Sequence, residues 1–281
     1  MLGAGDSQRV ADLIRETAAT ELLPRFRNLS KDDVRLKGPG DFVTVADLAA
    51  EQRLASGLAK ILPGVPVVGE EAVENDPSLL ELIGRPDEAC WIVDPLDGTA
   101  NFATGKDTFA IIVALVRNAQ TIGGWILDVP GDRLTVAIEG QGVTLDGQRV
   151  HGASVEKPSG YVGAKVRKTF DRELPDAQRG RLGKIRSTGC AGIEYIDILA
   201  GRASFCLYRR SKPWDHAAGA LMLKEAGGDT VRFDGEPYSP AQNIHAGIIG
   251  SSSTTVLATV RSIFEAARMP LLAPSPARTV G

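Results

Sequence analysis

Residues 91–102 read Trp91-Ile92-Val93-Asp94-Pro95-Leu96-Asp97-Gly98-Thr99-Ala100-Asn101-Phe102. The apolar start predicts a strand, and Pro95 prevents simple continuation of that strand after Asp94. Asp97 follows three residues after Asp94, so a tight turn can bring both carboxylates to face one point. The amides of Gly98 and Thr99 would face an anion if a helix began there, and the Thr99 hydroxyl adds a neutral oxygen. Such an oxygen-only set suits Mg²⁺, whereas an Asx turn capped by Thr99 is the simpler alternative.

Acidic residues stand at comparable places elsewhere in the chain. Glu70 and Glu71 follow a predicted strand over residues 65–68, while Asp47 and Asp215 each begin a predicted helix. Taken singly, the Glu pair fits a solvated surface, and the two Asp residues fit helix N-termini. Four acidic loops in one chain favour a shared metal site over four independent local roles.

The order of the predicted elements indicates stacked layers of helices and sheets. Helices are expected over 7–29 and 45–62, and a β-meander over 109–138. Helices and strands alternate over 192–268, whereas the charged segment 165–184 has no clear period and is interpreted as a surface connection. We therefore expect an α+β fold rather than a doubly wound sheet. The inner stripe of the helix over 45–62 is expected to be Leu48, Leu54, Leu58 and Ile61.

Composition narrows the class of protein. The 281 residues carry a formal net charge of -3, with 43% hydrophobic and 24% charged residues, which is typical of a globular protein and argues against a nucleic-acid binder. No apolar run reaches the roughly 18 residues of a membrane helix, and no apolar signal core opens the chain. Cys90, Cys190 and Cys206 are too widely spaced for a metal or disulfide framework. We expect a cytoplasmic protein with buried thiols.

The motifs resemble those of the inositol monophosphatase family, within the larger group of Mg²⁺-dependent, lithium-sensitive phosphomonoesterases. The resemblance covers residues 7–268, and the matching pieces stand in the family's order: Lys37, Asp41-Phe-Val-Thr-Val-Ala-Asp47, Gly69-Glu70-Glu71, Trp91–Phe102, Gly189-Cys190-Ala191, Pro213-Trp214-Asp215 and Glu225-Ala-Gly-Gly228. It implies a layered αβαβα sandwich. We expect one catalytic domain over 1–281, with two sub-lobes that meet at about 150–185 and a disordered tail over 270–281.

Carried over residue by residue, the resemblance implies a site for two to three Mg²⁺ ions. The ligands would be Glu70, Asp94, Asp97, Asp215 and the carbonyl of Leu96, with Asp94 shared between two ions. A third, weaker ion would contact Glu70 and water.

The resemblance also implies catalytic and phosphate-binding residues. Thr99 would complete the first ion's ligands and hydrogen-bond Asp47, and this pair with Glu70 would orient and deprotonate the attacking water. The amides of Gly98 and Thr99 would cradle the phosphate, and Ala191 would line the substrate pocket. Direct attack by water inverts phosphorus, so no phosphoenzyme is expected.

The chain departs from the family on the substrate side. Members specific for inositol phosphate commonly carry Glu seven residues before the motif Asp, and here that position is Tyr208. Arg209 and Arg210 follow, and they form either a solvated basic loop or a cationic rim that contacts a second anionic group. We expect a small phosphorylated alcohol or sugar of the inositol-1-phosphate type as substrate. A bisphosphate is the alternative, such as fructose 1,6-bisphosphate or 3′-phosphoadenosine 5′-phosphate.

An alternative hypothesis, from a different functional class, is a transcription-associated interaction protein, because some bacterial relatives act with the transcription machinery. The intact ligand set and the 5% aromatic content favour an enzyme and argue against nucleic acid as partner. We therefore expect a phosphoric monoester hydrolase whose partner is a small phosphorylated metabolite. We do not expect it to bind a membrane. The family is often dimeric, so a homodimer is compatible with the resemblance. His216 is expected to be a packed residue, and Cys190 a pocket-lining residue rather than a nucleophile.

Overall fold

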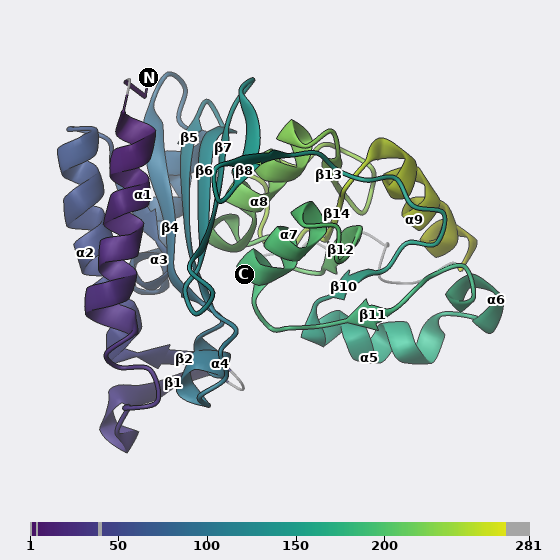
Figure 1. Cartoon of the computed structure of the whole chain (residues 1–281), viewed down its shortest axis with the longest axis horizontal. Coiled ribbons are helices and arrows are strands. Elements are labelled where there is room, and N and C mark those ends of the chain that lie inside the picture. The colour runs from purple at the N-terminus through teal and green to yellow at the C-terminus, as the bar shows by residue number, and fades with distance from the viewer. Residues whose placement is uncertain (1, 4, 39–40, 268–281) are drawn as a thin grey trace, which may run out of the picture.

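A seven-stranded sheet forms the first half of the protein in the computed structural model, which describes residues 2–3, 5–38 and 41–267 (Figure 1). Its strands, in spatial order, are β3 (Val67–Gly69), β4 (Ala89–Asp97), β5 (Ala110–Arg117), β6 (Gln120–Asp128), β7 (Arg133–Ile138), β8 (Gly142–Leu145) and β9 (Gln148–Val150). Strands β4 to β9 run antiparallel to their neighbours, and β3 pairs with β4 in parallel. Asp146 and Gly147 join β8 to β9 with φ values of 50° and 75°, the left-handed geometry of a two-residue hairpin turn.

A five-stranded mixed sheet forms the second half. Its strands, in spatial order, are β11 (Ile185–Arg186), β10 (Gly160–Val162), β12 (Phe205–Tyr208), β14 (Ile248–Ser251) and β13 (Asp229–Arg232). A separate antiparallel pair, β1 (Val34–Gly38) and β2 (Asp41–Thr44), lies ahead of both sheets in the chain. The chain passes from the first sheet to the second over residues 151–159.

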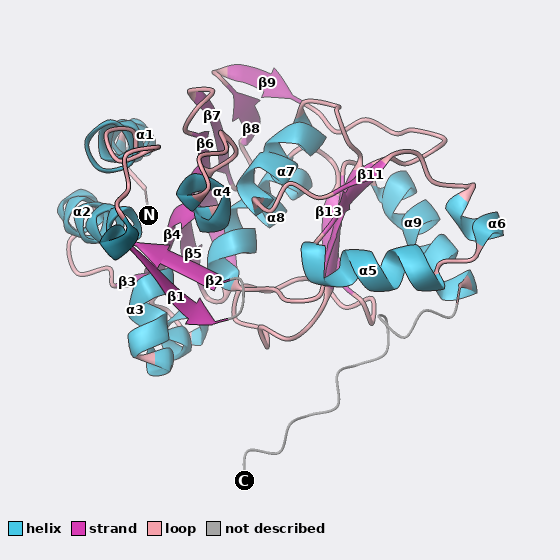
Figure 2. Cartoon of the chain, turned by 90° about the horizontal axis from the view of Figure 1, so that it is seen from below, coloured by secondary structure: helices cyan, strands magenta, loops and turns pink. Residues whose placement is uncertain are grey.

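Helices form the other layers (Figures 1 and 2). Helices α1 (Asp6–Thr17) and α2 (Val45–Ile61) cover the outer face of the seven-stranded sheet. Helices α7 (Ala191–Leu199) and α8 (Pro213–Glu225) lie between the two sheets, and α5 (Ala164–Glu173) and α9 (Thr254–Ala266) cover the far face of the second. The expected αβαβα layering is confirmed. Shorter helices are α3 (Glu70–Asn75), α4 (Thr99–Ala103), α6 (Asp176–Arg179), a π-helical turn Ala18–Leu22, and 3₁₀ turns at Lys31–Asp33 and Pro77–Gly84.

The alternation of side chains along β4 explains why it is buried on both faces. Trp91 and Val93 pack with the core beneath α1 and α2, whereas Cys90 and Ile92 pack with the core around α7 and α8. A strand covered on both faces is apolar throughout, and each fully buried side chain such as Ile92 contributes about 1.5–3 kcal/mol. The rigid strand ends at the acidic turn.

Two sequence expectations about helices are wrong. Leu48 is 47% exposed, and α2 instead buries Ala46 and Ala50 ahead of Leu54, because two alanines allow a closer approach to the sheet. The segment 165–184 is not an aperiodic connection, because it contains α5 and α6. Val166, Phe170 and Leu174 are buried at i, i+4 and i+8, a period that the intervening charged residues obscure.

Other boundaries also differ from expectation. The helix expected over 7–29 loses its regular form at Thr17, where a π-helical turn over Ala18–Leu22 follows. None of the described helices is long and apolar enough to cross a membrane. The tail that we expected to be disordered, 270–281, lies outside the described residues.

Phe170→Ala tests the packing of α5. The ring is fully buried and lies 5.9 Å from the ring of Phe264, centroid to centroid. We expect a loss of about 3–5 kcal/mol in the free energy of unfolding, measured by denaturant titration. The control Arg172→Ala, exposed on the same helix, should change it by no more than about 0.5 kcal/mol. Equal effects of the two variants would show that α5 does not pack on the second sheet.

Candidate metal centre and active site

Four carboxylates from three separate elements gather at the end of β4. Burial raises the pKa of Asp94 well above its ordinary value, and the neighbouring carboxylates raise it further; they belong to Glu70, Asp97 and Asp215. Burial also raises the pKa of Asp215 to about 8 and that of Asp97 to about 6. Asp94 is only 2% exposed. Like charges placed together away from water repel one another, and a bound cation would relieve that repulsion.

A bulge in β4 brings Asp94 and Asp97 to one side of the sheet. The ladder pairs Asp94 with Ile112 and Asp97 with Ala110, so β4 contains one residue more than β5 over this stretch. In a regular strand, residues three apart point to opposite faces, and one extra residue reverses that relation. The Leu96 amide donates to Asp94 Oδ1 at 3.0 Å and closes the turn.

Gly98 and Thr99 continue this turn into α4. Gly98 has a φ of 90°, and a Cβ there would lie 2.8 Å from the Thr108 carbonyl oxygen, so only glycine fits. The hydrogen bond expected between Thr99 Oγ1 and Asp47 Oδ1 is present at 2.9 Å, and the Leu96 carbonyl oxygen lies 2.9 Å from the same hydroxyl. Burial raises the pKa of Asp47 to about 7. The geometry therefore couples the helix start that holds Asp47 to the acidic turn.

Asp97 also anchors the N-terminus of α7. Its Oδ2 accepts from the Gly192 amide at 2.6 Å and from Cys190 Sγ at 3.1 Å. The amide of Ala191 lowers the pKa of Asp97 as well, so this residue also faces the carboxylate. Burial and the Asp97 charge raise the pKa of Cys190, which keeps the thiol protonated as a hydrogen-bond donor.

Two lysines face the acidic residues that begin α3. Lys212 Nζ donates to Glu70 Oε1 at 3.0 Å, while Lys37 Nζ lies 2.8 Å from Glu71 Oε1 and 3.7 Å from Glu70 Oε1. Within residues 2–3, 5–38 and 41–267, no three His, Cys, Asp or Glu side chains are placed so that they could hold a metal ion as they stand. Glu70 would have to exchange its lysine partners for a metal before it could act as a ligand.

Comparison with known proteins identifies the family. The sequence model of the inositol monophosphatase family matches residues 7–265. The chain belongs to this family.

Two named relatives match about three quarters of the chain, and a solved structure has the same fold. Inositol-1-monophosphatase from Rhizobium meliloti (strain 1021) is 33% identical over 225 residues, covering 78% of this chain and 82% of that protein. Nus factor SuhB from Escherichia coli (strain K12) is 32% identical over 219 residues, covering 75% and 79%. Among solved structures, the Thermotoga maritima IMPase TM1415 has a TM-score of 0.77 and 26% identity, covering 92% of this chain and 96% of that one.

Glu51 supports the family's Glu-Glu motif, and the sequence analysis missed it. Its two carboxylate oxygens accept from the amides of Glu71 and Ala72, both at 2.9 Å. A Cβ at Gly69 would lie 2.3 Å from this carboxylate, so glycine is needed for the approach. Glu51 stands four residues after Asp47 on the same helix, a spacing that places both on one face and could have revealed it. Glu51 therefore fixes the start of α3, and with it the backbone of Glu70.

Glu194 is a second residue that the sequence analysis missed. Its carboxylate accepts from the Tyr208 hydroxyl and, at 2.8 Å, from both the amide and the hydroxyl of Thr188. Burial raises the pKa of Glu194 to about 7. No local sequence signal pairs these residues, because Tyr208 lies 14 positions further along the chain.

The remaining predicted site residues lie around these pairs. Arg209 and Arg210 are exposed, and in the described part of the chain neither they nor Tyr208 form a hydrogen bond or ion pair with the four clustered carboxylates. His216 is buried, with Nδ1 3.2 Å from the Tyr195 hydroxyl and Nε2 3.1 Å from the Arg210 carbonyl oxygen. Burial lowers the pKa of His216 to about 3, so the ring stays neutral and packed, as expected.

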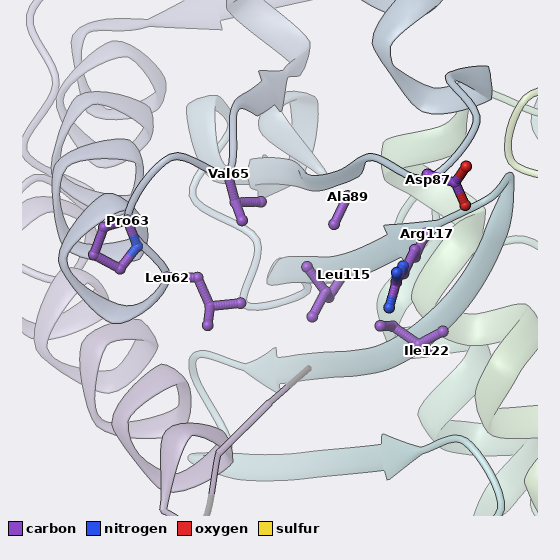
Figure 3. Close-up of a pocket in the computed structure, with 8 residues that line it drawn as sticks. All are labelled: Leu62, Pro63, Val65, Asp87, Ala89, Leu115, Arg117 and Ile122. Carbon is purple, nitrogen blue, oxygen red and sulfur yellow. The ribbon is translucent and has the colours of Figure 1, made fainter.

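An apolar cavity of about 350 Å³ lies at the opposite end of the first sheet (Figure 3). Ala89, the first residue of β4, lines it, whereas Asp94 and Asp97 lie at the other end of that strand. It is lined by Leu62, Pro63, Val65, Asp87, Ala89, Leu115, Arg117 and Ile122. This cavity is therefore separate from the candidate active site.

Glu51→Gln tests the support of α3. The Gln side chain has one oxygen acceptor where Glu51 has two, so the backbone N–H of either Glu71 or Ala72 loses its partner. We therefore expect the free energy of unfolding to fall by about 1–3 kcal/mol. Glu74→Gln, on the exposed face of α3, provides the matched control. Denaturant unfolding of both proteins measures the difference. A loss no larger than that of the control would mean that Glu51 does not hold the helix.

Glu194→Gln tests the buried carboxyl through the pH dependence of stability. The pKa of Glu194 in the folded protein, about 7, lies above the ordinary value of 4.5, so folding favours the protonated form. The contribution of Glu194 to the free energy of unfolding is complete below pH 4.5 and is lost as the pH rises through 7. Between pH 4.5 and pH 7 the free energy of unfolding of the native protein should fall by roughly 3 kcal/mol relative to that of the Glu194→Gln variant. Denaturant unfolding in EDTA measures both. The free energy of unfolding of the exposed Glu156→Gln variant should change with pH as that of the native protein does. The same pH dependence in Glu194→Gln would contradict the prediction.

Proposed function

We propose that the protein is a Mg²⁺-dependent phosphomonoesterase that hydrolyses a small phosphorylated alcohol or sugar by direct attack of water. The observation that carries this proposal is the gathering of four mutually repelling carboxylates at one strand end, of which Asp94 and Asp97 are buried and Glu70 and Asp215 are half-buried. Membership of the inositol monophosphatase family supports it, as does similarity to proteins named inositol-1-monophosphatase. We also infer a cytoplasmic location, a small phosphorylated metabolite as partner and, on the family resemblance, a homodimer.

The chemistry of the donor set fits Mg²⁺. All the groups offered are oxygens: the four clustered carboxylates, the carbonyl of Leu96 and the hydroxyl of Thr99. Hard divalent cations prefer such ligands, completed by water and substrate phosphate. Two to three ions would supply electrophilic stabilisation of the leaving oxygen and lower the pKa of water. The raised pKa of Asp94 shows how unfavourable the cluster is without such a charge.

The chain's own residues would orient the nucleophile and the phosphate. Thr99 Oγ1, fixed by Asp47 at 2.9 Å, can accept a proton from the attacking water while it passes its own to Asp47 Oδ1. Glu70 would orient the same water once its ion pair with Lys212 opens. The amides of Gly98 and Thr99 would hold phosphate oxygens, and Ala191 would line the pocket.

Similarity to Nus factor SuhB favours a second candidate of another class, a transcription-associated interaction protein. Co-purification of the native protein and RNA polymerase from its own cells tests it. Association that persists in a variant without phosphatase activity would make interaction the main function. Its absence, together with Mg²⁺-dependent turnover, would leave the enzyme.

Phosphate release with Mg²⁺ and with EDTA tests the enzyme directly. The substrates are inositol 1-phosphate, fructose 1,6-bisphosphate, 3′-phosphoadenosine 5′-phosphate and histidinol phosphate. Asp94→Asn should lower turnover at least about a hundredfold, because it removes a charge shared between two metal sites, while the protein stays folded. Asp12→Asn, exposed on α1, is the control and should match the native protein. Undiminished release by the Asp94→Asn protein, or release in EDTA equal to that in Mg²⁺, would refute the assignment; inhibition by lithium would support it.

A further inference from the structure

The loop between β12 and α8, residues Arg209–Lys212, passes beside the candidate metal centre. Lys212 at its end donates to Glu70 at 3.0 Å, and Asp215 follows in the first turn of α8. The loop therefore borders the carboxylate cluster, where the phosphate of the proposed reaction would bind.

Buried contacts fix the backbone of this loop. His216 Nε2 donates to the Arg210 carbonyl at 3.1 Å, because a carbonyl oxygen can only accept, and Nδ1 of the neutral ring accepts from the Tyr195 hydroxyl. The Ser211 amide donates to the Ile244 carbonyl at 2.9 Å, and Gln242 Nε2 donates to Ser211 Oγ at 2.8 Å. A loop held from both sides presents its side chains from a defined place, which lowers the entropic cost of binding a ligand.

The residue that precedes the loop offers no carboxylate to a substrate. Tyr208 directs its hydroxyl to Glu194, and its ring packs 4.5 Å from the ring of His216, centroid to centroid. Glu194 is 1% exposed and has all its contacts within the protein. A polyol that needs a carboxylate to accept from its hydroxyl groups at this position would therefore find none, because Tyr208 has no carboxylate and Glu194 is buried.

Arg209 and Arg210 offer charge of the opposite sign. Both are exposed, and neither side chain forms an ion pair or hydrogen bond with any residue that the structure describes. Arg202, which precedes β12, is by contrast paired with Asp197 at 2.5 Å. Unpaired guanidinium groups on a fixed loop beside a phosphate site are suited to bidentate contact with an anion.

We propose that Arg209 and Arg210 form a second anion-binding subsite, and that the preferred substrate carries a further phosphate or carboxylate besides the phosphate that is removed. This inference rests on the proposed phosphomonoesterase function and names its substrate class.

Two matched substrate pairs test the subsite. Fructose 1,6-bisphosphate is compared with fructose 1-phosphate, and 3′-phosphoadenosine 5′-phosphate with 3′-adenosine monophosphate, with the released position identified by product analysis. Within a pair the removed phosphate is the same and the remote phosphate differs. We expect kcat/KM to be about tenfold or more higher for the doubly anionic member of at least one pair, mainly through a lower KM.

Arginine variants locate the effect. Arg209→Gln, Arg210→Gln and the double variant should bring the ratio within the favoured pair down about tenfold, towards one. Arg117→Gln removes an exposed arginine at the opposite end of the first sheet and should leave the ratio unchanged. A native ratio near one in both pairs, or a ratio that the double variant does not alter, would overturn the proposal.

Failure of the proposed function would look different. If Mg²⁺ supports no phosphate release from any substrate, the phosphomonoesterase assignment fails, and calorimetric binding of fructose 1,6-bisphosphate and 3′-phosphoadenosine 5′-phosphate in EDTA still tests the subsite. Binding of either by the native protein that the double variant loses would support the subsite. No binding of either by the native protein would overturn it.

Discussion

The one-residue bulge between Asp94 and Asp97 is the constraint on which the candidate site depends. It turns two carboxylates three residues apart to the same face, directly beyond a strand that is buried on both sides. The core residues of β4 cannot shift to relieve the repulsion, because helices pack on both faces of the strand. Burial therefore holds the charges together, and the site exists because the surrounding core is stable enough to offset that cost.

Compensating contacts distribute this cost over several elements. The start of α7 donates to Asp97, the start of α2 holds Asp47 against Thr99, and two lysines contact the acids of α3. Each contact approaches the cluster from a helix terminus or a flexible side chain. Backbone amides at helix starts stabilise negative charge without adding a mobile cation that would compete for the same oxygens. The lysines would compete, so Glu70 is the acidic residue whose environment would have to change most for the proposed metal to bind.

Sequence reasoning could predict the parts of this site whose spacing is local. Asp94, Asp97 and Thr99 lie within one short segment, and the Asp47–Thr99 hydrogen bond followed from a family motif. The Lys212–Glu70 pair joins residues 142 positions apart and leaves no pattern in the sequence. The Glu51 contacts with α3 span 20 positions, and only the four-residue spacing of Glu51 from Asp47 on α2 points to them. Packing of α2 follows its spacing more closely than its hydrophobicity: Leu48 lies six residues before Leu54 and falls off the buried stripe, whereas Ala46 and Ala50 stand at four-residue steps from Leu54.

Under the two proposals above, helix α8 would separate the residues of catalysis from those of specificity. Asp215 sits in its first turn, while the loop that precedes it contains Arg209 and Arg210 on the solvent side. Because His216 fixes the Arg210 carbonyl from within the helix, side chains in the loop can change while the backbone and Asp215 keep their positions. Under the proposed function, a fold built this way would retain one metal centre while the molecule that it recognises changes.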